Sequence, residues 1–262
     1  MAKLKNTTVS GDIILPTGTT TQRNNSPFNG ELRFNTNSDD YEFYSNVWRG
    51  SPAASVSGSV NTFTYGIYTV HEFTNNGTFT VTQSGLVDIL LVAGGGGAGG
   101  NDDAGGGGAG GVVFRINFPV TVQSYSIVVG NGGAVETNGE DTTAFGLTAI
   151  GGGRGGRNGS FGPSTGGSGG GGWWNADGAA ALQPGSASGG YGNEGGEGDR
   201  GTVSFEGAGG GGAGGPGVNS NTDFGGQASP GGYGIYFGNY FGDSVGEDGW
   251  FASGGSGGGE TS

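Results

Sequence analysis

The chain has 262 residues, of which 69 are Gly and 8 are Pro, and its formal net charge is −13 at pH 7. Nucleic-acid affinity depends on Lys and Arg side chains that neutralise phosphates, so nine scattered basic residues argue against a nucleic-acid partner. With no cysteine and a single histidine, His71, the sequence offers no thiolate or His-based metal site and no cysteine nucleophile.

The start of the chain lacks the features of a secretory signal. Lys3 and Lys5 are followed by no apolar stretch, and the longest apolar run, residues 89–93, is too short to cross a bilayer. We therefore expect no membrane insertion and a protein that is made and assembled in the cytoplasm.

Glycine content and charge divide the chain into at least two parts. Only 8 of the 69 glycines precede Gly94, and residues 1–50 hold five basic and five acidic groups, which leaves the whole net charge on the remainder. Ordering a Gly-rich chain costs about 1–2 kcal/mol of backbone entropy per residue. We therefore expect dense hydrogen bonding and a homo-oligomer, a trimer.

The first fifty residues predict a β-hairpin module. Side chains alternate with period two in residues 31–36 and 41–44, on either side of the polar residues 37–40. Residues 10–15 are a candidate strand that ends at turn residues 16–18. Residues 51–61, rich in Ser, Ala and Gly, are typical of a linker.

Residues 62–150 predict an antiparallel β unit with glycine loops. Turn signals at residues 75–77 and 83–85 separate runs of β-branched and aromatic residues. The runs are 62–73, 78–82, 86–93, 112–118 and 125–129. No segment combines helical apolar spacing with good helix formers, so we expect almost no helix.

Residues 151–262 consist of glycine tracts with short polar or aromatic insertions. The tracts are residues 151–156, 166–172, 189–198, 207–217 and 254–259. Consecutive glycines can form extended threefold helices of the polyglycine II type, which pack more closely than any other sequence allows. A solvated tether is the alternative, but aromatic insertions in a tether would promote aggregation. We therefore predict stacked polyglycine-II-like helices.

The aromatic insertions are candidates for recognition. Rings beside Asn, Asp and Gly suit stacking on sugars or contacts with protein loops, although the same residues could anchor a subunit contact. We expect Phe205 and Phe224 in the core, and Trp173, Trp174 and residues 233–241 exposed. The candidate receptor-binding residues are Trp173, Trp174, Asn175, Asp177, Tyr191, Tyr233, Tyr236, Phe237, Tyr240, Phe241 and Trp250.

Motifs for enzymatic chemistry are weak, and we expect no enzyme. Gly94, Gly96 and Gly99 match the dinucleotide fingerprint, but residues 101–104, which include the acidic pair Asp102 and Asp103, follow where a helix should hold the pyrophosphate. His71 in a β-like run is expected at a surface or an edge strand, because no nucleophile elbow presents a serine to it. Residues 195–199 approach a calcium-binding repeat, but solvated charge is the favoured interpretation and we expect no cofactor.

Residues 11–49 resemble a module of tail-fibre and structural proteins of marine phages. The residues that carry this resemblance are Pro16, Gly18, Thr19, Thr20, Gln22, Arg23, Gly30, Arg33, Asn35, Thr36, Glu42 and Trp48. Asn24 departs from the pattern, in which a proline is expected. The resemblance implies that residues 1–50 attach the chain to other virion proteins, with Gly18, Gln22, Arg23, Gly30, Arg33, Asn35, Glu42 and Trp48 as the module's characteristic residues.

Residues 63–153 resemble the glycine-rich domain of phage tail proteins, through Phe73 to Val81, the run from Asp88 into Gly94, and Ile127 to Gly133. The later tracts are similar in composition to the tips of long-tail-fibre adhesins of T-even-like phages. Those tips stack polyglycine helices and bind the host receptor with the loops between them. The resemblance implies an all-β virion protein that attaches to a host surface glycan or outer-membrane protein.

The predicted organisation has four parts: residues 1–50, the attachment module; 51–61, a linker; 62–150, the β unit; and 151–262, the polyglycine-helix region. The predicted function is host attachment by a phage tail fibre. A purely structural virion protein, such as a head fibre, collar or tail decoration, is the alternative. An ice-binding protein is a third class, but it needs regular Gly-x-x triplets that this chain lacks.

Overall fold

The computed structural model describes residues 15–27, 31–37, 40–44, 48–49, 52–100, 103–158, 161–199, 206–220 and 228–259. The chain forms two compact units. The first comprises residues 1–55, 81–87 and 117–123, and the second comprises residues 56–80, 88–116 and 124–262. Regular structure in the described ranges is almost entirely β, which confirms the predicted class.

A small four-stranded sheet forms the N-terminal module. Strand β1 (Thr17–Gly18) is parallel to β2 (Leu32–Asn35), which pairs antiparallel with β3 (Asp40–Tyr44). The short β4 (Trp48–Arg49) pairs antiparallel with β3, and a 3-10 turn, η1 (Thr20–Gln22), follows β1. The predicted β2–β3 hairpin is confirmed, with Arg33 opposite Glu42.

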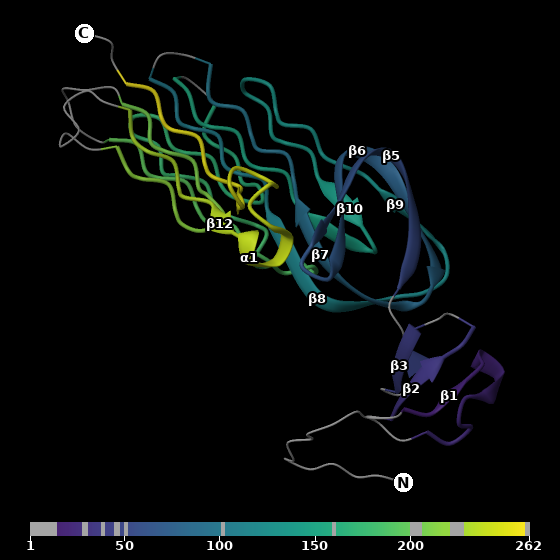
Figure 1. The fold of residues 1–262 in the computed structure, drawn as a ribbon. Helices are drawn as coiled ribbons and strands as arrows, with labels where there is room; N and C mark the ends of the chain where they lie inside the picture. The colour runs from purple at the N-terminus through teal and green to yellow at the C-terminus, as the bar shows by residue number, and fades with distance from the viewer. Residues whose placement is uncertain are drawn as a thin grey trace, which may run out of the picture. The chain divides into compact units, whose positions relative to one another are not determined.

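Two sheets follow the module (Figure 1). Strands β5 (Ala53–Tyr65), β6 (Tyr68–Gln83) and β9 (Ser124–Ile127) form one, in that order, and β7 (Gly85–Val92) pairs with β8 (Val112–Val120) to form the other. The expected strands near residues 86–93, 112–118 and 125–129 are therefore present.

Three local predictions were wrong. Thr17 and Gly18, expected in a turn, form β1, because β2 offers them a hydrogen-bonding edge. Residues 53–61, expected in a linker, belong to β5, because pairing with β6 satisfies their backbone groups. The expected break at residues 75–77 is absent, and β6 runs through it. Residues 10–14 lie outside the described residues.

The absent break has a steric explanation. A Cβ on Gly77 would lie 2.5 Å from the carbonyl oxygen of Ser57, and Gly58 has φ +111°. Here glycine permits close approach of two paired strands, as at a β-bulge, and does not end a strand. The chain reverses instead at Gly66, whose φ is +61°.

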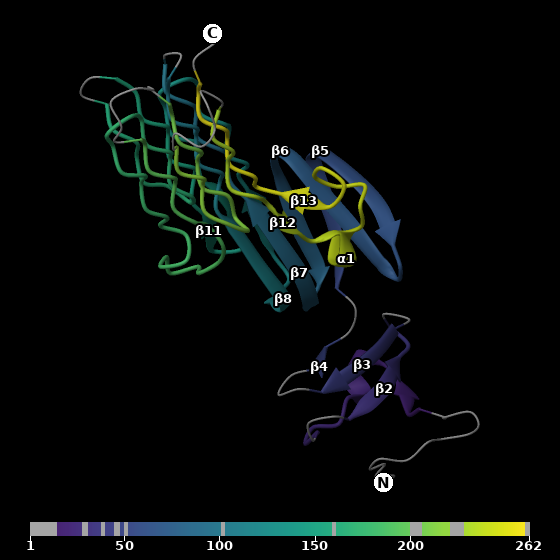
Figure 2. The same ribbon diagram turned by 90° about the vertical axis from the view of Figure 1, so that its left-hand side faces the viewer.

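Beyond the sheets, glycine-rich segments run side by side as a lattice (Figures 1 and 2). Residues 105–111 illustrate its hydrogen bonding, in which every third amide donates to the same neighbouring segment. The pairs to one neighbour are Gly105 N to Gly156 O, Gly108 N to Gly153 O and Gly111 N to Ile150 O, and those to a second are Gly106 N to Ala208 O and Ala109 N to Gly211 O. A three-residue cycle identifies the threefold polyglycine II helix. The predicted stacking is confirmed.

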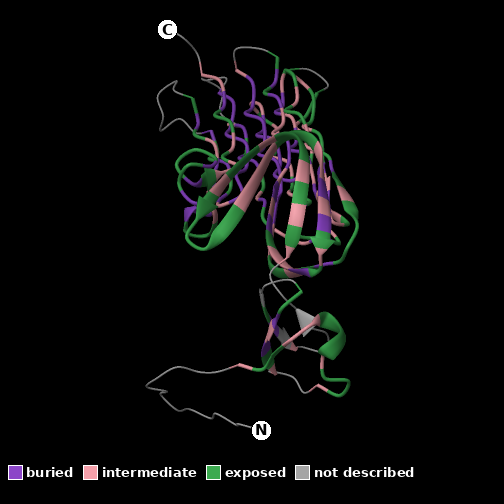
Figure 3. Ribbon diagram, turned by 45° about the vertical axis from the view of Figure 1, so that its right-hand side comes forward, coloured by how far each residue is buried: buried purple, intermediate pink, exposed green. Residues whose placement is uncertain are grey.

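At many interior positions of the lattice the close spacing leaves no room for a side chain, although the small side chains of Ala109 and Ala208 are buried there. A Cβ on Gly107 would lie 2.0 Å from Gly96 O, and one on Gly210 would lie 2.1 Å from Gly107 O. On the surface the restriction ends, since a Cβ on Gly95 meets its nearest atom at 3.7 Å. Figure 3 shows the same division, with buried residues concentrated in the lattice segments.

The lattice begins earlier than expected and turns at two ends. Residues 94–111 and 130–140 hydrogen-bond with segments that follow residue 150, across the predicted boundary. We call the end joined to the β strands the sheet end and the opposite end the loop end (Figure 2). The described turns at the loop end contain residues 98–100, 134–137, 157–158, 161–163 and 173–177.

A short insertion packs at the sheet end. It contains β12 (Ile235–Tyr236), α1 (Gly238–Phe241) and β13 (Trp250–Phe251), and β12 pairs antiparallel with β13. The hairpin β10 (Thr142–Ala144) and β11 (Leu147–Ala149) lies in the same unit. No helix in the described ranges is long and apolar enough to cross a bilayer.

Candidate binding surfaces

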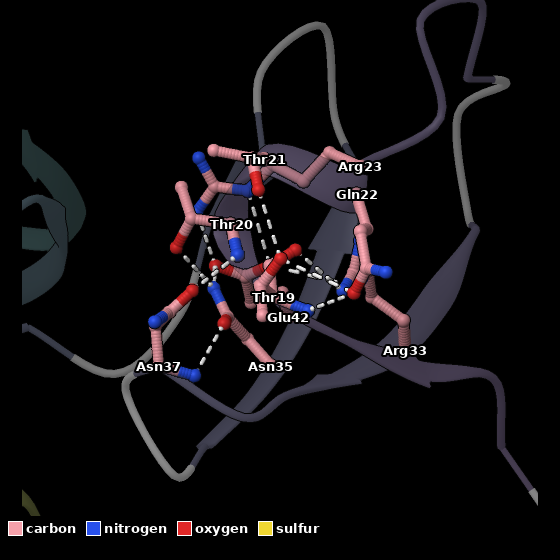
Figure 4. Close-up of polar contacts among 9 residues, drawn as sticks. All are labelled: Thr19, Thr20, Thr21, Gln22, Arg23, Arg33, Asn35, Asn37 and Glu42. Carbon is pink, nitrogen blue, oxygen red and sulfur yellow. Dashed lines mark hydrogen bonds and ion pairs between the residues drawn. The ribbon is translucent and has the colours of Figure 1, made fainter.

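A polar network centred on Glu42 holds the N-terminal module together (Figure 4). The Glu42 side chain is only 2% exposed. Arg23 forms an ion pair with Glu42 and also donates from Nε to its Oε2 at 3.2 Å, while Asn35 Nδ2 donates to Oε1 at 2.8 Å. The Arg33 guanidinium lies 3.9 Å from Oε2. One buried carboxylate therefore connects β2, β3 and the end of η1.

The same network fixes the segment between β1 and η1. Arg33 donates to the carbonyl oxygen of Thr19 at 3.0 Å, and Gln22 Oε1 accepts the Thr19 amide at 2.8 Å. A Cβ on Gly18 would lie 3.0 Å from both Arg33 Nη2 and Gln22 Oε1. A side chain at position 18 would therefore push the ends of Arg33 and Gln22 aside by a few tenths of an ångström.

The charge on Glu42 is stabilised despite its burial. Burial alone would raise its pKa, but hydrogen bonds from Arg23 and Asn35 and the charges of Arg23 and Arg33 outweigh it. The pKa of Glu42 is consequently lowered from its ordinary value of 4.5. The carboxylate stays ionised and acts as a structural acceptor at neutral pH.

Six of the eight characteristic module residues thus meet in one network: Gly18, Gln22, Arg23, Arg33, Asn35 and Glu42. Gly30 lies outside the described residues, and Trp48 is placed only by its backbone in β4. Asn37 also belongs to the network, since its Oδ1 accepts the Thr20 amide at 2.7 Å, and sequence reasoning missed it. Its position beside the hairpin turn, where Asn commonly bonds backbone, is the signal that could have found it.

The candidate receptor-binding residues do not form one surface. Those at the sheet end are Tyr191, Tyr233, Tyr236, Phe237, Tyr240, Phe241 and Trp250, and those at the loop end are Trp173, Trp174, Asn175 and Asp177. The hydrogen bond between Val112 N and Tyr191 O places Tyr191 at the sheet end. The hydrogen bond between Gly172 N and Gly196 O places the neighbouring Trp173 at the loop end.

At the sheet end, the expected exposure of Phe237 was wrong. Phe237 is 4% exposed, and its ring lies 4.8 Å from that of Phe114 on β8. Tyr240 also contacts Phe114, at 4.7 Å, and Phe241 is half-buried in the same cluster. The insertion must bury apolar rings to stay on the lattice edge, because its own short strands supply few hydrogen bonds.

Other rings at the sheet end remain in contact with solvent. Tyr233 is 66% exposed and Trp250 is 51% exposed. Tyr236 lies 5.4 Å from Trp250 and donates from Oη to Asp243 Oδ1 at 2.6 Å. That hydrogen bond raises the pKa of Tyr236 above 10.0, and it fixes the ring beside Trp250.

At the loop end, Trp173 and Trp174 form a tight turn. Their ring centroids are 5.4 Å apart, Trp174 has φ +36°, and Ala176 N donates to Trp173 O at 2.9 Å. Both indoles are half-buried, while Asn175 and Asp177 on the same turn are exposed. The turn therefore presents short polar groups beside partly accessible rings. Phe205 and Phe224, expected in the core, lie outside the described residues.

Two arginines at the loop end were missed by the sequence reasoning. Arg154 and Arg157 lie over the ring of Phe161, at 5.3 Å and 4.5 Å from its centroid. Arg157 Nη1 also pairs with Glu136 Oε1 at 2.9 Å. Their spacing of three residues was the available signal, because a threefold helix places such residues on one side.

The remaining motifs have structural explanations. A Cβ on Gly94 or Gly96 would lie 1.9 Å or 2.2 Å from a neighbouring carbonyl oxygen, and residues 103–111 are not helical. The fingerprint glycines thus serve lattice packing. Among the described residues, no three His, Asp or Glu side chains converge at a possible metal site. Residues 195–198 are a lattice segment.

His71 lies on β6 and is half-buried, at a point of the strand that precedes the residues 77–80 paired with β9. Its Nδ1 lies 3.0 Å from Thr62 Oγ1, and its ring meets Phe79 edge-on at 5.8 Å. Burial lowers the pKa of His71 below 6.5.

Comparison with known proteins gives one finding. A family model described as a glycine-rich domain matches residues 74–262, which include the lattice and both of its ends. A search of the curated proteins finds no match, and a search of the solved structures also finds none.

Proposed function

The chain belongs to the glycine-rich domain family, and we propose that it is a phage tail-fibre or adhesin protein that attaches the virion to the host cell by non-covalent receptor binding. The observation that carries the proposal is the loop end of the lattice. Backbone hydrogen bonds hold the ends of many turns there, and one of these turns exposes Asn175 and Asp177.

Such a platform suits recognition for a physical reason. Binding costs less when the contact residues are already ordered, and the lattice fixes where each turn begins and ends. The turn at residues 173–177 combines two half-buried indoles with exposed Asn175 and Asp177. Rings and short polar side chains of this kind contact sugars or protein loops. The receptor is a host surface glycan or an outer-membrane protein.

The N-terminal module supplies attachment to other virion proteins. Its characteristic polar residues point inward to Glu42, so they stabilise the module and leave its remaining surface for the partner. The virion is the proposed location, after assembly in the host cytoplasm, and the proposed assembly is a homotrimer. Ile67 at the β5–β6 turn is 91% exposed, and burial of such a side chain against another copy would contribute about 1.5–3 kcal/mol.

The test has two parts. Mass spectrometry of purified virions must find the chain, and labelled full-length protein must bind host cells and compete with virion adsorption. Replacement of Asn175 and Asp177 by Ala, two exposed residues, is expected to reduce cell binding by about tenfold or more. The matched control replaces Ser244 and Glu247, two exposed residues of the insertion at the opposite end, by Ala and should leave binding unchanged.

A purely structural virion protein is the second candidate function. The exposed rings Tyr233 and Trp250 at the sheet end favour it, because neighbouring subunits could cover them. Unchanged adsorption in the Asn175 and Asp177 variant, with the chain present in the virion and Trp250 protected from labelling, would establish this candidate and exclude the adhesin.

A further inference from the structure

A pair of arginines and a phenylalanine form a second feature of the loop end. Arg154 and Arg157 belong to one lattice segment, and three residues per turn bring both to the same side of it. Both guanidinium groups lie over Phe161, which is itself 44% exposed. Cation–π contacts with one ring therefore hold close together two cations that would otherwise repel each other.

The hydrogen bonding of these cations is incomplete. Arg157 Nη1 is paired with Glu136, but Arg157 Nε and Arg154 Nη1 have negligible solvent exposure and no hydrogen-bond partner among the described residues. A shielded donor that lacks an acceptor is costly, and guanidinium donors bond carboxylate or phosphate oxygens most strongly. An oxyanion cannot reach these shielded atoms, but it can bind the accessible part of the two side chains, since the Arg157 side chain is 34% exposed and Arg154 is half-buried.

The distribution of charge also singles out this pair. Residues 56–80, 88–116 and 124–262 contain only four basic residues: Arg115, Arg154, Arg157 and Arg200. Arg115 donates to the carbonyl oxygens of Phe114 and Ser188 at the sheet end, and Arg200 lies outside the described residues. On a chain with a net charge of −13, an anion is repelled from most of the surface and attracted at Arg154 and Arg157.

We propose that Arg154 and Arg157, gathered by Phe161, bind an anionic group of a surface glycan, either the carboxylate of an acidic sugar or a phosphate. Glu136 competes with this ligand, since its carboxylate occupies one face of Arg157. The inference rests on the proposed attachment function, for which it names the chemical class of the receptor.

The experiment measures binding of the full-length protein to polygalacturonate, a phosphorylated mannan and neutral dextran. The wild-type chain should bind one or both anionic polymers, with affinity that falls as salt rises, and should not bind dextran. The acidic and phosphorylated polymers distinguish the two sources of the anion. Equal binding to dextran would overturn the proposal.

Three variants sharpen the test. The double variant Arg154→Gln and Arg157→Gln should lose about tenfold or more in affinity for the anionic polymer. Arg115→Gln removes one positive charge at the sheet end, half of what the double variant removes, and should bind as the wild type does. Glu136→Gln removes a competing carboxylate and should bind more tightly, an outcome that damaged folding cannot imitate.

Unchanged binding in the arginine double variant, or weaker binding in Glu136→Gln, would overturn the inference. If the chain binds no anionic polymer but still competes with virion adsorption, this inference fails and the attachment function stands. If the chain is absent from virions, the attachment function fails whatever the polymers show.

Discussion

The N-terminal module and the glycine lattice are stabilised in different ways, the module by hydrogen bonds of side chains and the lattice by hydrogen bonds of the backbone. In the module, side chains from three segments meet at Glu42, and the hydrogen bonds that matter involve Arg23, Asn35 and Gln22. In the lattice, backbone amides and carbonyls make the hydrogen bonds, and at positions such as Gly107 and Gly210 even a methyl group would collide with a neighbouring segment. The stability of the module depends on particular side chains, and the stability of the lattice depends on glycines that lack a side chain.

The largest effect expected from this contrast is in the lattice. Gly107→Ala places a Cβ 2.0 Å from Gly96 O, and a backbone obstacle cannot rotate away. We expect a loss of about 3 kcal/mol or more, which corresponds to roughly 6–12 °C in Tm measured by calorimetry. Gly95→Ala, with its nearest contact at 3.7 Å, is the control and should stay within about 0.5 kcal/mol of wild type. Equal losses would contradict backbone packing as the cause.

A smaller effect is expected in the module. Glu42→Gln removes the charge that Arg23 and Arg33 face, and we expect a loss of about 2 kcal/mol. Hydrogen exchange of peptides covering residues 31–44 should accelerate, while exchange in residues 105–111 should not. Glu31→Gln is the matched control, because its hydrogen bond to Asn24 is exposed. Faster exchange in both regions would show that the two share one cooperative unit.

Lowering the pH should destabilise the module and not the lattice. The loss of stability should be no larger than the loss that Glu42→Gln causes. The pKa of Glu42 is lowered in the folded chain, so its contribution is fully present above the ordinary value of 4.5 and is lost as pH falls through the lowered pKa. The amide hydrogen bonds of the lattice do not titrate. Exchange measured at decreasing pH, corrected for the intrinsic rate, should therefore show the module opening first. Opening of both regions at the same pH would contradict this prediction.

The candidate sites were predicted to an uneven degree. Gly18, Gln22, Arg23, Arg33, Asn35 and Glu42 were recognised by resemblance, but only the structure shows that they contact one another. Phe237 was expected to be exposed and is buried against Phe114, because sequence spacing says nothing about which strand an insertion returns to. Arg154 and Arg157 were not singled out, although their spacing of three residues places them on one side of a threefold helix, and only the structure shows that both meet Phe161.

The sequence by itself determined the kind of backbone that this chain can form. Glycine tracts without Cβ atoms permit threefold helices in close contact, and the alternating residues around positions 37–40 specify a hairpin. Tertiary structure alone decided which segments are neighbours: that residues 105–111 lie antiparallel to 150–156 and parallel to 208–211, and that residues 75–77 continue a strand. Glycine carries no side chain to mark a partner, so the register of a glycine lattice comes from the turns and insertions at its two ends.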